Sequence, residues 1–202
     1  MTIQLETRQQ YIDFLSRFDT FLFDCDGVIW HGNDMIPNVK SVLSQLVATG
    51  KRIMFVTNNS SKSRKTYLKK FEALGIDTTI DHIFGSSYCA AYYMANDLKF
   101  PKDRKVYVFG SRGVTDELDE VGLKWVGSNL DAENITDVSE MSNVDLEEGV
   151  GAVLVGFDLD MNYKKLGKAH QHLMNPDTIF LATNDDKTFP VRKAIVLALI
   201  SM

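Results

Sequence analysis

Apolar residues along the chain follow two alternating patterns: short runs rich in Val, Ile and Phe, and longer segments in which apolar positions recur with a helical period. The short runs predict buried strands, and the longer segments predict helices that join them. In the first half, these patterns predict helices at 7–18, 38–50 and 63–75 and strands at 20–24 and 52–59. Gly50 and Gly75 stand where two of these helices should stop, as a C-terminal cap with positive φ requires.

The second half of the chain restarts the same alternation after a polar turn around Pro101. We predict helices at 113–122 and 162–174 and strands at 106–110, 124–127, 151–158 and 178–186. The acidic, polar stretch at 131–148 predicts a loop with little fixed structure. Strands joined by crossover helices form parallel sheets, so the predicted fold class is α/β, in two series that meet near Pro101.

Composition places the chain among ordinary globular proteins. Of its 202 residues, 45% are hydrophobic and 24% are charged, which argues against a disordered or fibrous class. The formal net charge of −5 argues against a nucleic-acid partner, because phosphate backbones are bound by clusters of Lys and Arg. No apolar run approaches a membrane span, and the N-terminus lacks the pattern of a secretory signal. We therefore expect a cytoplasmic protein without a membrane or nucleic-acid partner.

Two aspartates stand at the end of the first predicted strand. In residues 20–30, TFLFDCDGVIW, Asp24 ends the strand, and Asp26 and Gly27 follow it. An unpaired buried carboxylate is strongly disfavoured, so we expect Asp24 at the carboxyl edge of the sheet, where ligands of open parallel sheets bind. The alternative is that the aspartates merely cap a turn, since Asp and Gly are ordinary turn residues. Cys25, on the opposite side of an extended chain, is interpreted as a packing residue.

The next predicted strand also ends in polar residues. Thr57, Asn58 and Asn59 lie at the same sheet edge as Asp24 if the two strands are parallel neighbours. The alternative interpretation is that Asn59 or Ser60 caps the following helix. Capping and phosphate binding are compatible, because free backbone N–H groups at a helix start favour an anion.

Two carboxylates beside a cluster of hydroxyl and amide donors suggest phosphoryl transfer through a covalent aspartyl phosphate. Asp24 would attack phosphorus as a carboxylate nucleophile. Asp26 would protonate the leaving alcohol and then deprotonate the water of the second step. Thr57 and Asn58 would hold the phosphoryl oxygens by hydrogen bonds. Mg²⁺, bound by carboxylates and phosphate oxygens, would relieve the repulsion between phosphate and nucleophile and orient the attack.

The same residues carry a resemblance to a known family. FDCDGVIW, at 23–30, and FVTNNSSKSR, at 55–64, resemble motifs I and II of the haloacid dehalogenase superfamily. Together with GVGAVLVGFDLDMNYKKL and IFLATNDDKTFP, they closely resemble its branch of eukaryotic 4-nitrophenylphosphatases and phosphoglycolate phosphatases, which carries a C2-type α/β cap. The resemblance implies Asp24 as nucleophile, Asp26 as acid/base, and Mg²⁺ bound by Asp24 and by the backbone carbonyl of Asp26. It also implies Thr57 and Asn58 as phosphate contacts, with Asn59 nearby.

The resemblance also implies a domain organisation and a substrate class. Residues 1–100 would form part of a Rossmann-like parallel sheet core, incomplete here, and residues 101–190 the cap; residues 191–202 resemble a helix returning to the core. The implied reaction is Mg²⁺-dependent hydrolysis of a small phosphorylated metabolite, with 4-nitrophenyl phosphate as an artificial substrate and 2-phosphoglycolate as the natural one. A homodimer through the cap is expected by analogy.

The resemblance stops near Pro190. Members of the family continue with a lysine that pairs with the aspartyl phosphate and an acidic segment that completes the Mg²⁺ site, and neither motif follows Pro190 in this sequence. We therefore expect a chain that is truncated or rearranged there, or continued by residues outside this sequence. Two alternative hypotheses stay open: a catalytically incomplete fragment that acts only as a binding or interaction module, and a signalling receiver that is phosphorylated on aspartate.

Overall fold

The computed structural model describes residues 4–186 and the backbone of residues 188–191 and 194–197. The first series of elements contains α1 (Arg8–Ser16), β1 (Thr20–Asp24), β2 (Trp30–His31), β3 (Asp34–Met35), α2 (Val39–Ala48), β4 (Arg52–Thr57), α3 (Arg64–Ala73), η1 (Ile80–His82) and β5 (Ile83–Gly85). The helices and strands predicted for this part are confirmed to within a few residues. Gly50 and Gly75 follow α2 and α3 with φ of 77° and 66°, as predicted. The hairpin β2-β3 was not predicted, because two-residue strands are too short to show a period.

The second series contains α4 (Ser86–Tyr92), the π-helix η2 (Tyr93–Asp97), β6 (Lys105–Phe109), α5 (Arg112–Glu120), β7 (Lys124–Gly127), η3 (Ser128–Asp131), η4 (Val138–Asn143), β8 (Val150–Val155), α6 (Tyr163–Leu173), β9 (Ile179–Ala182), β10 (Thr188–Val191) and β11 (Ala194–Leu197). The longest of these helices, α6, has 11 residues. Along the described part of the chain, no helix is long and apolar enough to cross a bilayer.

Two predictions for the second series need correction. The stretch at 131–148 is not a loop throughout, because it contains η4, whose start is closed by a reciprocal capping box between Asp137 and Glu140. The helix predicted at 191–202 is wrong over residues 194–197, which form β11 and pair with β10 in antiparallel fashion. β-Branched Ile195 and Val196 favour an extended backbone. Residues 192–193 and 198–202 lie outside the described residues.

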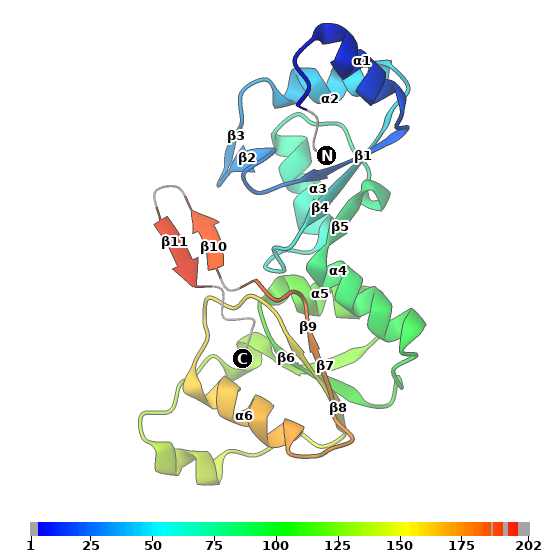
Figure 1. Cartoon of the computed structure of the whole chain (residues 1–202). Coiled ribbons are helices and arrows are strands. Elements are labelled where there is room, and N and C mark those ends of the chain that lie inside the picture. The colour runs from blue at the N-terminus through cyan, green and yellow to red at the C-terminus, as the bar shows by residue number, and fades with distance from the viewer. Residues whose placement is uncertain (1–3, 187, 192–193, 198–202) are drawn as a thin grey trace.

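Two parallel sheets organise the molecule and occupy its upper and lower parts in Figure 1. The first has the strand order β1-β4-β5, and the second has the order β7-β6-β8-β9. Every strand pair in these two sheets is parallel. The predicted α/β class is therefore confirmed.

The first sheet is packed on one face by α2 and α3. Leu43 of α2 and Phe71 of α3 share an apolar cluster with Ile53 and Phe55 of β4. Because side chains alternate along a strand, Leu22 of β1 points to the other face, where it is 69% exposed. Only one face of this sheet therefore carries a buried core within the described residues.

The second sheet is packed on both faces. Val106 and Val108 belong to a cluster that includes residues of α4, η2 and α5. Tyr107 and Phe109, which alternate with them along β6, belong to a second cluster that includes Ala169 of α6. The result is a three-layer unit in which Val106 to Phe109 of the central strand β6 are buried, as expected for a parallel sheet.

The division into residues 1–100, 101–190 and 191–202 stays a prediction. Packing links the segment before residue 101 to the second sheet: the side chains of Ala90, Ala91, Met94 and Phe100 lie in the same cluster as those of β6. We call the sheet β1-β4-β5 with its helices the first unit, and the sheet β7-β6-β8-β9 with its helices the second unit. The two units meet where α3 of the first lies against α5 of the second, next to the end of β4 (Figure 1).

Candidate active site

The carboxyl ends of β1 and β4 meet at one edge of the first sheet. In the parallel register Asp24 lies opposite Val56, so Thr57 stands one position beyond it. Thr57 Oγ1 donates a hydrogen bond to Asp26 Oδ2 at 3.3 Å. The structure therefore brings the aspartate turn and the polar end of β4 together, as the parallel arrangement predicted.

A tight turn after β1 fixes the position of Asp26. Gly27 has φ of 87°, and its N–H donates to the carbonyl of Trp30 at 2.7 Å. This turn brings the Trp30 side chain back onto Asp26, where Nε1 donates to Asp26 Oδ1 at 2.8 Å. Both carboxylate oxygens of Asp26 thus have a donor, one from the aspartate turn itself and one from β4.

Asp24 lies beside Asp26; the residue is exposed, but its carboxylate is partly buried. Its Oδ1 accepts the backbone N–H of Cys25 at 2.7 Å. Burial raises the pKa of Asp24; this backbone donor partly offsets the effect, and the charges of Asp26 and Asp186 add to it. Cys25 itself is fully buried and belongs to the core, and burial raises the pKa of its thiol well above the usual range. A buried, protonated thiol is unreactive, which agrees with the packing role predicted for Cys25.

Asn58 is tied to a segment far away in the sequence. Its Nδ2 donates to Asp186 Oδ2 at 2.9 Å. Its backbone carbonyl accepts Asn184 Nδ2 at 2.6 Å and Ser86 Oγ at 2.7 Å. The polar segment after β9 thus reaches the end of β4 and places a third carboxylate, that of Asp186, near Asp24.

Asn59 shapes the turn itself. Its Oδ1 accepts hydrogen bonds from the backbone N–H of Ser61 at 3.0 Å and from Ser61 Oγ at 2.6 Å. This Asx-type turn bends the chain between β4 and α3. The Asn59 side chain is thus engaged inside the turn, and its predicted place near a phosphate stays a prediction.

Asp186 and Asn184 were not predicted as parts of this site, and Trp30 was expected either at its rim or packed onto the core. Asn58 and Asp186 are 128 positions apart, and their contact depends on how the two units pack. A usable signal did exist in the polar run at 183–186, because it follows an apolar strand in the same way as Asp24 and Thr57 do.

Lys70 is a cation close to this edge, but it serves another purpose. Its Nζ donates to the carbonyl of Gly32 at 2.7 Å and lies 3.9 Å from the centre of the Trp30 ring. Burial lowers the pKa of Lys70, an effect that the charge of Asp26 partly offsets. Lys70 thus fixes the β2-β3 hairpin and the Trp30 ring rather than presenting a free charge to the site.

The donor set fits a hard cation. Asp24 and Asp26 offer oxygen ligands, which Mg²⁺ prefers, and Asp24 lies at the solvent-accessible end of its strand while the carboxylate of Asp26 is occupied by Trp30 and Thr57. Within the described ranges, no three His, Cys, Asp or Glu side chains are grouped so that they could hold a metal ion. An ion here would therefore need water and substrate oxygens to complete its shell, which is common for Mg²⁺ in proteins.

Fold and site together define an α/β protein with a carboxylate site at the carboxyl edge of a parallel sheet and a second α/β unit beside it. Residues 21–124 match the haloacid dehalogenase-like hydrolase family, and the chain belongs to that family. The resemblance drawn from the sequence motifs is thus confirmed.

Known relatives match along almost the whole chain. The chain is 42% identical over 191 residues to a 4-nitrophenylphosphatase of Schizosaccharomyces pombe, which covers 94% of this chain and 64% of the relative. It is 45% identical over 186 residues to the chloroplastic phosphoglycolate phosphatase 1A of Arabidopsis thaliana, which covers 92% of this chain and 50% of the relative. The chain thus spans between half and two thirds of the length of these curated relatives.

Solved structures share the fold. A p-nitrophenyl phosphatase from Archaeoglobus fulgidus superposes with a TM-score of 0.72 at 26% identity, over 90% of this chain and 60% of that one. A glycerol phosphate phosphatase from Mycobacterium tuberculosis, in complex with magnesium, superposes with a TM-score of 0.70 at 23% identity, over 91% of this chain and 49% of that one.

Proposed function

We propose that this protein is a Mg²⁺-dependent phosphomonoester hydrolase that acts through an aspartyl-phosphate intermediate. One observation carries the proposal: Asp24, at the solvent-accessible end of a strand in a parallel sheet, stands beside Asp26, which Trp30 and Thr57 hold in place. The names of the relatives, which include two phosphatases more than 40% identical to this chain, support the same class of reaction.

In the first step Asp24 is the nucleophile. One of its oxygens forms a bond to phosphorus while the bond from phosphorus to the ester oxygen breaks. Asp26 in its protonated form gives its proton to the departing oxygen, so that an alcohol leaves rather than an alkoxide. Trp30 and Thr57 orient the Asp26 carboxyl group for this transfer.

In the second step Asp26 reverses its role. It takes a proton from a water molecule as that water attacks phosphorus, and the bond between phosphorus and the Asp24 oxygen breaks. Inorganic phosphate leaves, the Asp24 carboxylate is restored, and Asp26 is again protonated. Over the full cycle Asp26 thus gives up one proton and recovers one, and Asp24 serves only as the nucleophile.

Thr57 and Asn58 are suited to hold the phosphoryl oxygens. In the structure their side-chain donors are already engaged by carboxylates, Thr57 by Asp26 and Asn58 by Asp186. A phosphoryl group offers the same kind of anionic acceptor and would compete for these donors. Mg²⁺ held by Asp24 and by the backbone carbonyl of Asp26 would neutralise charge between the phosphate and the nucleophile.

The proposed substrate is a small phosphorylated metabolite. The relatives and the structural neighbours are named for 4-nitrophenyl phosphate, phosphoglycolate and glycerol phosphate, which share a phosphomonoester and differ in the leaving group. We propose 2-phosphoglycolate as the natural substrate. Formation of a homodimer through the second unit is also a proposal, which sedimentation velocity would test.

Turnover of 4-nitrophenyl phosphate tests the proposal, measured with Mg²⁺ and with EDTA on protein of verified intact mass. Hydrolysis should require Mg²⁺, Asp24→Asn should reduce it to background, and Asp26→Asn should lower kcat by about 10²- to 10⁴-fold. Undiminished activity of the Asp24→Asn variant would show that the covalent mechanism is wrong.

A non-catalytic binding module is the second candidate, and the fact that the chain spans between half and two thirds of the length of its curated relatives motivates it. Measurements on a single protein preparation distinguish the two candidate functions. Protein with the mass of 202 residues that binds inorganic phosphate and shows no turnover would support the module. Mg²⁺-dependent turnover by the same material would exclude it.

A further inference from the structure

Glu117 of α5 is a buried carboxylate in the second unit whose hydrogen-bond donors belong to the first. Its side chain is 2% exposed. Oε1 accepts the backbone N–H of Arg64 at 2.5 Å, and Oε2 accepts Arg64 Nε at 3.4 Å. A buried charge is tolerated only when it is paired and hydrogen-bonded, so the position of Glu117 depends on the start of α3.

The start of α3 in turn depends on Glu117. The first N–H groups of a helix have no partner within the helix, and Ser63, which precedes α3, makes no side-chain capping bond to them. Glu117 supplies that acceptor from the second unit, and its charge interacts favourably with the positive end of the helix. The Arg64 guanidinium lies between Glu117 and the ring of Tyr88, 3.5 Å from the ring centre, which holds this pair in one geometry.

The turn that links β4 to α3 is also held by the second unit. Ser60 is fully buried, and its Oγ accepts the backbone N–H of Phe157 at 2.8 Å. A Cβ added at Gly113, near the start of α5, would lie 2.5 Å from the carbonyl oxygen of Ser60 and closer still to the N–H of Lys62. The two backbones therefore approach so closely that no side chain fits between them.

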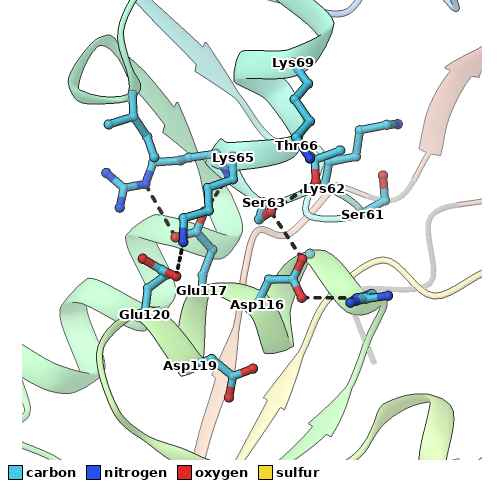
Figure 2. A pocket seen from close by; sticks show the side chains of 14 residues that line it. Ser61, Lys62, Ser63, Lys65, Thr66, Lys69, Asp116, Glu117, Asp119 and Glu120 are labelled. Atoms are coloured by element: carbon cyan, nitrogen blue, oxygen red, sulfur yellow. Dashed lines mark hydrogen bonds and ion pairs between the residues drawn. The ribbon is translucent and has the colours of Figure 1, made fainter.

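The ion pair between Lys65 and Glu120 lies next to the pair between Arg64 and Glu117 but is exposed to solvent. Lys65 Nζ lies 2.5 Å from Glu120 Oε1, with 62% and 44% of these side chains exposed. Both face an open groove of about 550 Å³ between α3 and α5, next to Glu117 (Figure 2). Exposed pairs contribute little to stability, because water and salt screen their charges. Glu120, one turn after Glu117 on the same helix, is thus a matched control.

We propose that Glu117 is a positioning residue for the phosphate-binding turn, residues 57–63, and that the second unit thereby sets the geometry of the reaction. This inference rests on the proposed function. Glu117 fixes the residue at which the turn enters α3, and the turn carries Thr57 and Asn58. A displacement of about 1 Å in a positioning group can cost on the order of 10²-fold in rate.

The test compares Glu117→Gln with Glu120→Gln. Hydrogen exchange measured by mass spectrometry should rise in peptides covering 57–67 for Glu117→Gln and stay unchanged for Glu120→Gln. With 4-nitrophenyl phosphate, kcat should fall about 10- to 100-fold for Glu117→Gln, at a temperature where melting curves show that the variant is folded, and stay within about twofold for Glu120→Gln.

The outcomes separate this inference from the proposed function. Equal exchange in both variants would overturn it, even in an active protein, and so would a raised exchange without any loss of kcat, since that would show a merely structural contact. Absence of turnover in the parent protein would refute the proposed function, and the exchange comparison would still decide whether Glu117 holds the turn. Glu117→Ala, which leaves Arg64 without its partner, should raise exchange in the same peptides more than Glu117→Gln does.

Discussion

At the scale of single residues, Asp24 carries a charge that the folded protein disfavours. Its pKa is raised above the ordinary value of 3.8, chiefly by burial. Between the ordinary and the raised value the folded state binds more protons than the unfolded state, so stability falls as pH rises through that window. The free energy of unfolding is therefore lower at neutral pH than it would be without this carboxylate.

Asp24→Asn should remove this penalty. The melting temperature of the variant minus that of the parent should increase as pH rises from about 4. This difference should become constant above the raised pKa of Asp24. Scanning calorimetry of both proteins from pH 3.5 to 7 measures the difference. Parallel curves over the whole range would mean that the Asp24 charge does not weaken the fold.

Trp30 positions Asp26 through one hydrogen bond, and Trp30→Phe removes that bond together with part of the ring that Lys70 covers. The Phe ring keeps much of the packing against Tyr67 and Phe71 but leaves Asp26 Oδ1 without its donor. Hydrogen bonds to charged groups contribute about 1.5–3 kcal/mol, so the free energy of unfolding should fall by that amount in urea titrations.

The matched control for this substitution is Trp125→Phe. Trp125 Nε1 donates to Asp119 Oδ1 at 2.9 Å, but Asp119 is exposed and can be solvated by water instead. We expect a loss of about 1 kcal/mol or less there. Equal losses in the two variants would show that the bond to Asp26 has no special weight.

At the scale of helices and strands, α6 depends on its N-cap. Asn162 Oδ1 accepts the backbone N–H of Lys165 at 2.9 Å, and its Nδ2 donates to the carbonyl of Asp131 at 2.9 Å. Asn162→Ala removes both bonds and should cost about 1–2 kcal/mol in thermal unfolding. Asn175→Ala, in the exposed turn beyond the same helix, should stay within about 0.5 kcal/mol. A similar cost at both positions would contradict the capping role.

Local patterns predicted most of these elements, because periodicity and caps are properties of neighbouring residues. The stops at Gly50 and Gly75 and all strands of the two parallel sheets except β5 followed from such signals. The π-helix η2 and the hairpin β2-β3 did not, because neither is long enough to show a period. The helix expected at 191–202 followed from the family resemblance, whereas residues 194–197 form a strand; a short apolar run is compatible with both elements and did not decide between them.

At the scale of the whole molecule, the two units differ in how their sheets are covered. β6 is buried on both faces, whereas Leu22 of β1 is 69% exposed. The contacts between the units are polar, such as the bonds of Glu117 and Ser60. No apolar cluster among the described residues joins the two sheets.

Native-state hydrogen exchange should therefore be slowest in β6 and β8 and faster in β1 and β4. Amides exchange through local openings, and openings are more frequent where fewer apolar contacts are buried. The measurement is the protection factor of each strand, read by mass spectrometry or NMR. Equal protection of β1 and β6 would show that the two units open together.

Much of the candidate site depends on contacts between the two units, which explains what the sequence could and could not predict. Asp24, Asp26 and Thr57 follow directly from strand ends in a parallel sheet. Asp186 and Glu117 reach the same region from the second unit, across 128 and 53 positions of sequence. Contacts between residues so far apart in the sequence depend on how the two units dock, and the periodicity of neighbouring residues carries no information about docking.

Gly113 sets a condition on any chimaera built from this protein. A Cβ at this position would lie 2.5 Å from the carbonyl oxygen of Ser60 and closer still to the backbone nitrogen of Lys62, so even alanine would force α5 away from the turn. A second unit transplanted from a relative would dock on this core only if it presents a glycine at the corresponding point. A single added methyl group at this point would therefore hinder domain exchange between such proteins even where the polar contacts of Glu117 and Ser60 are kept.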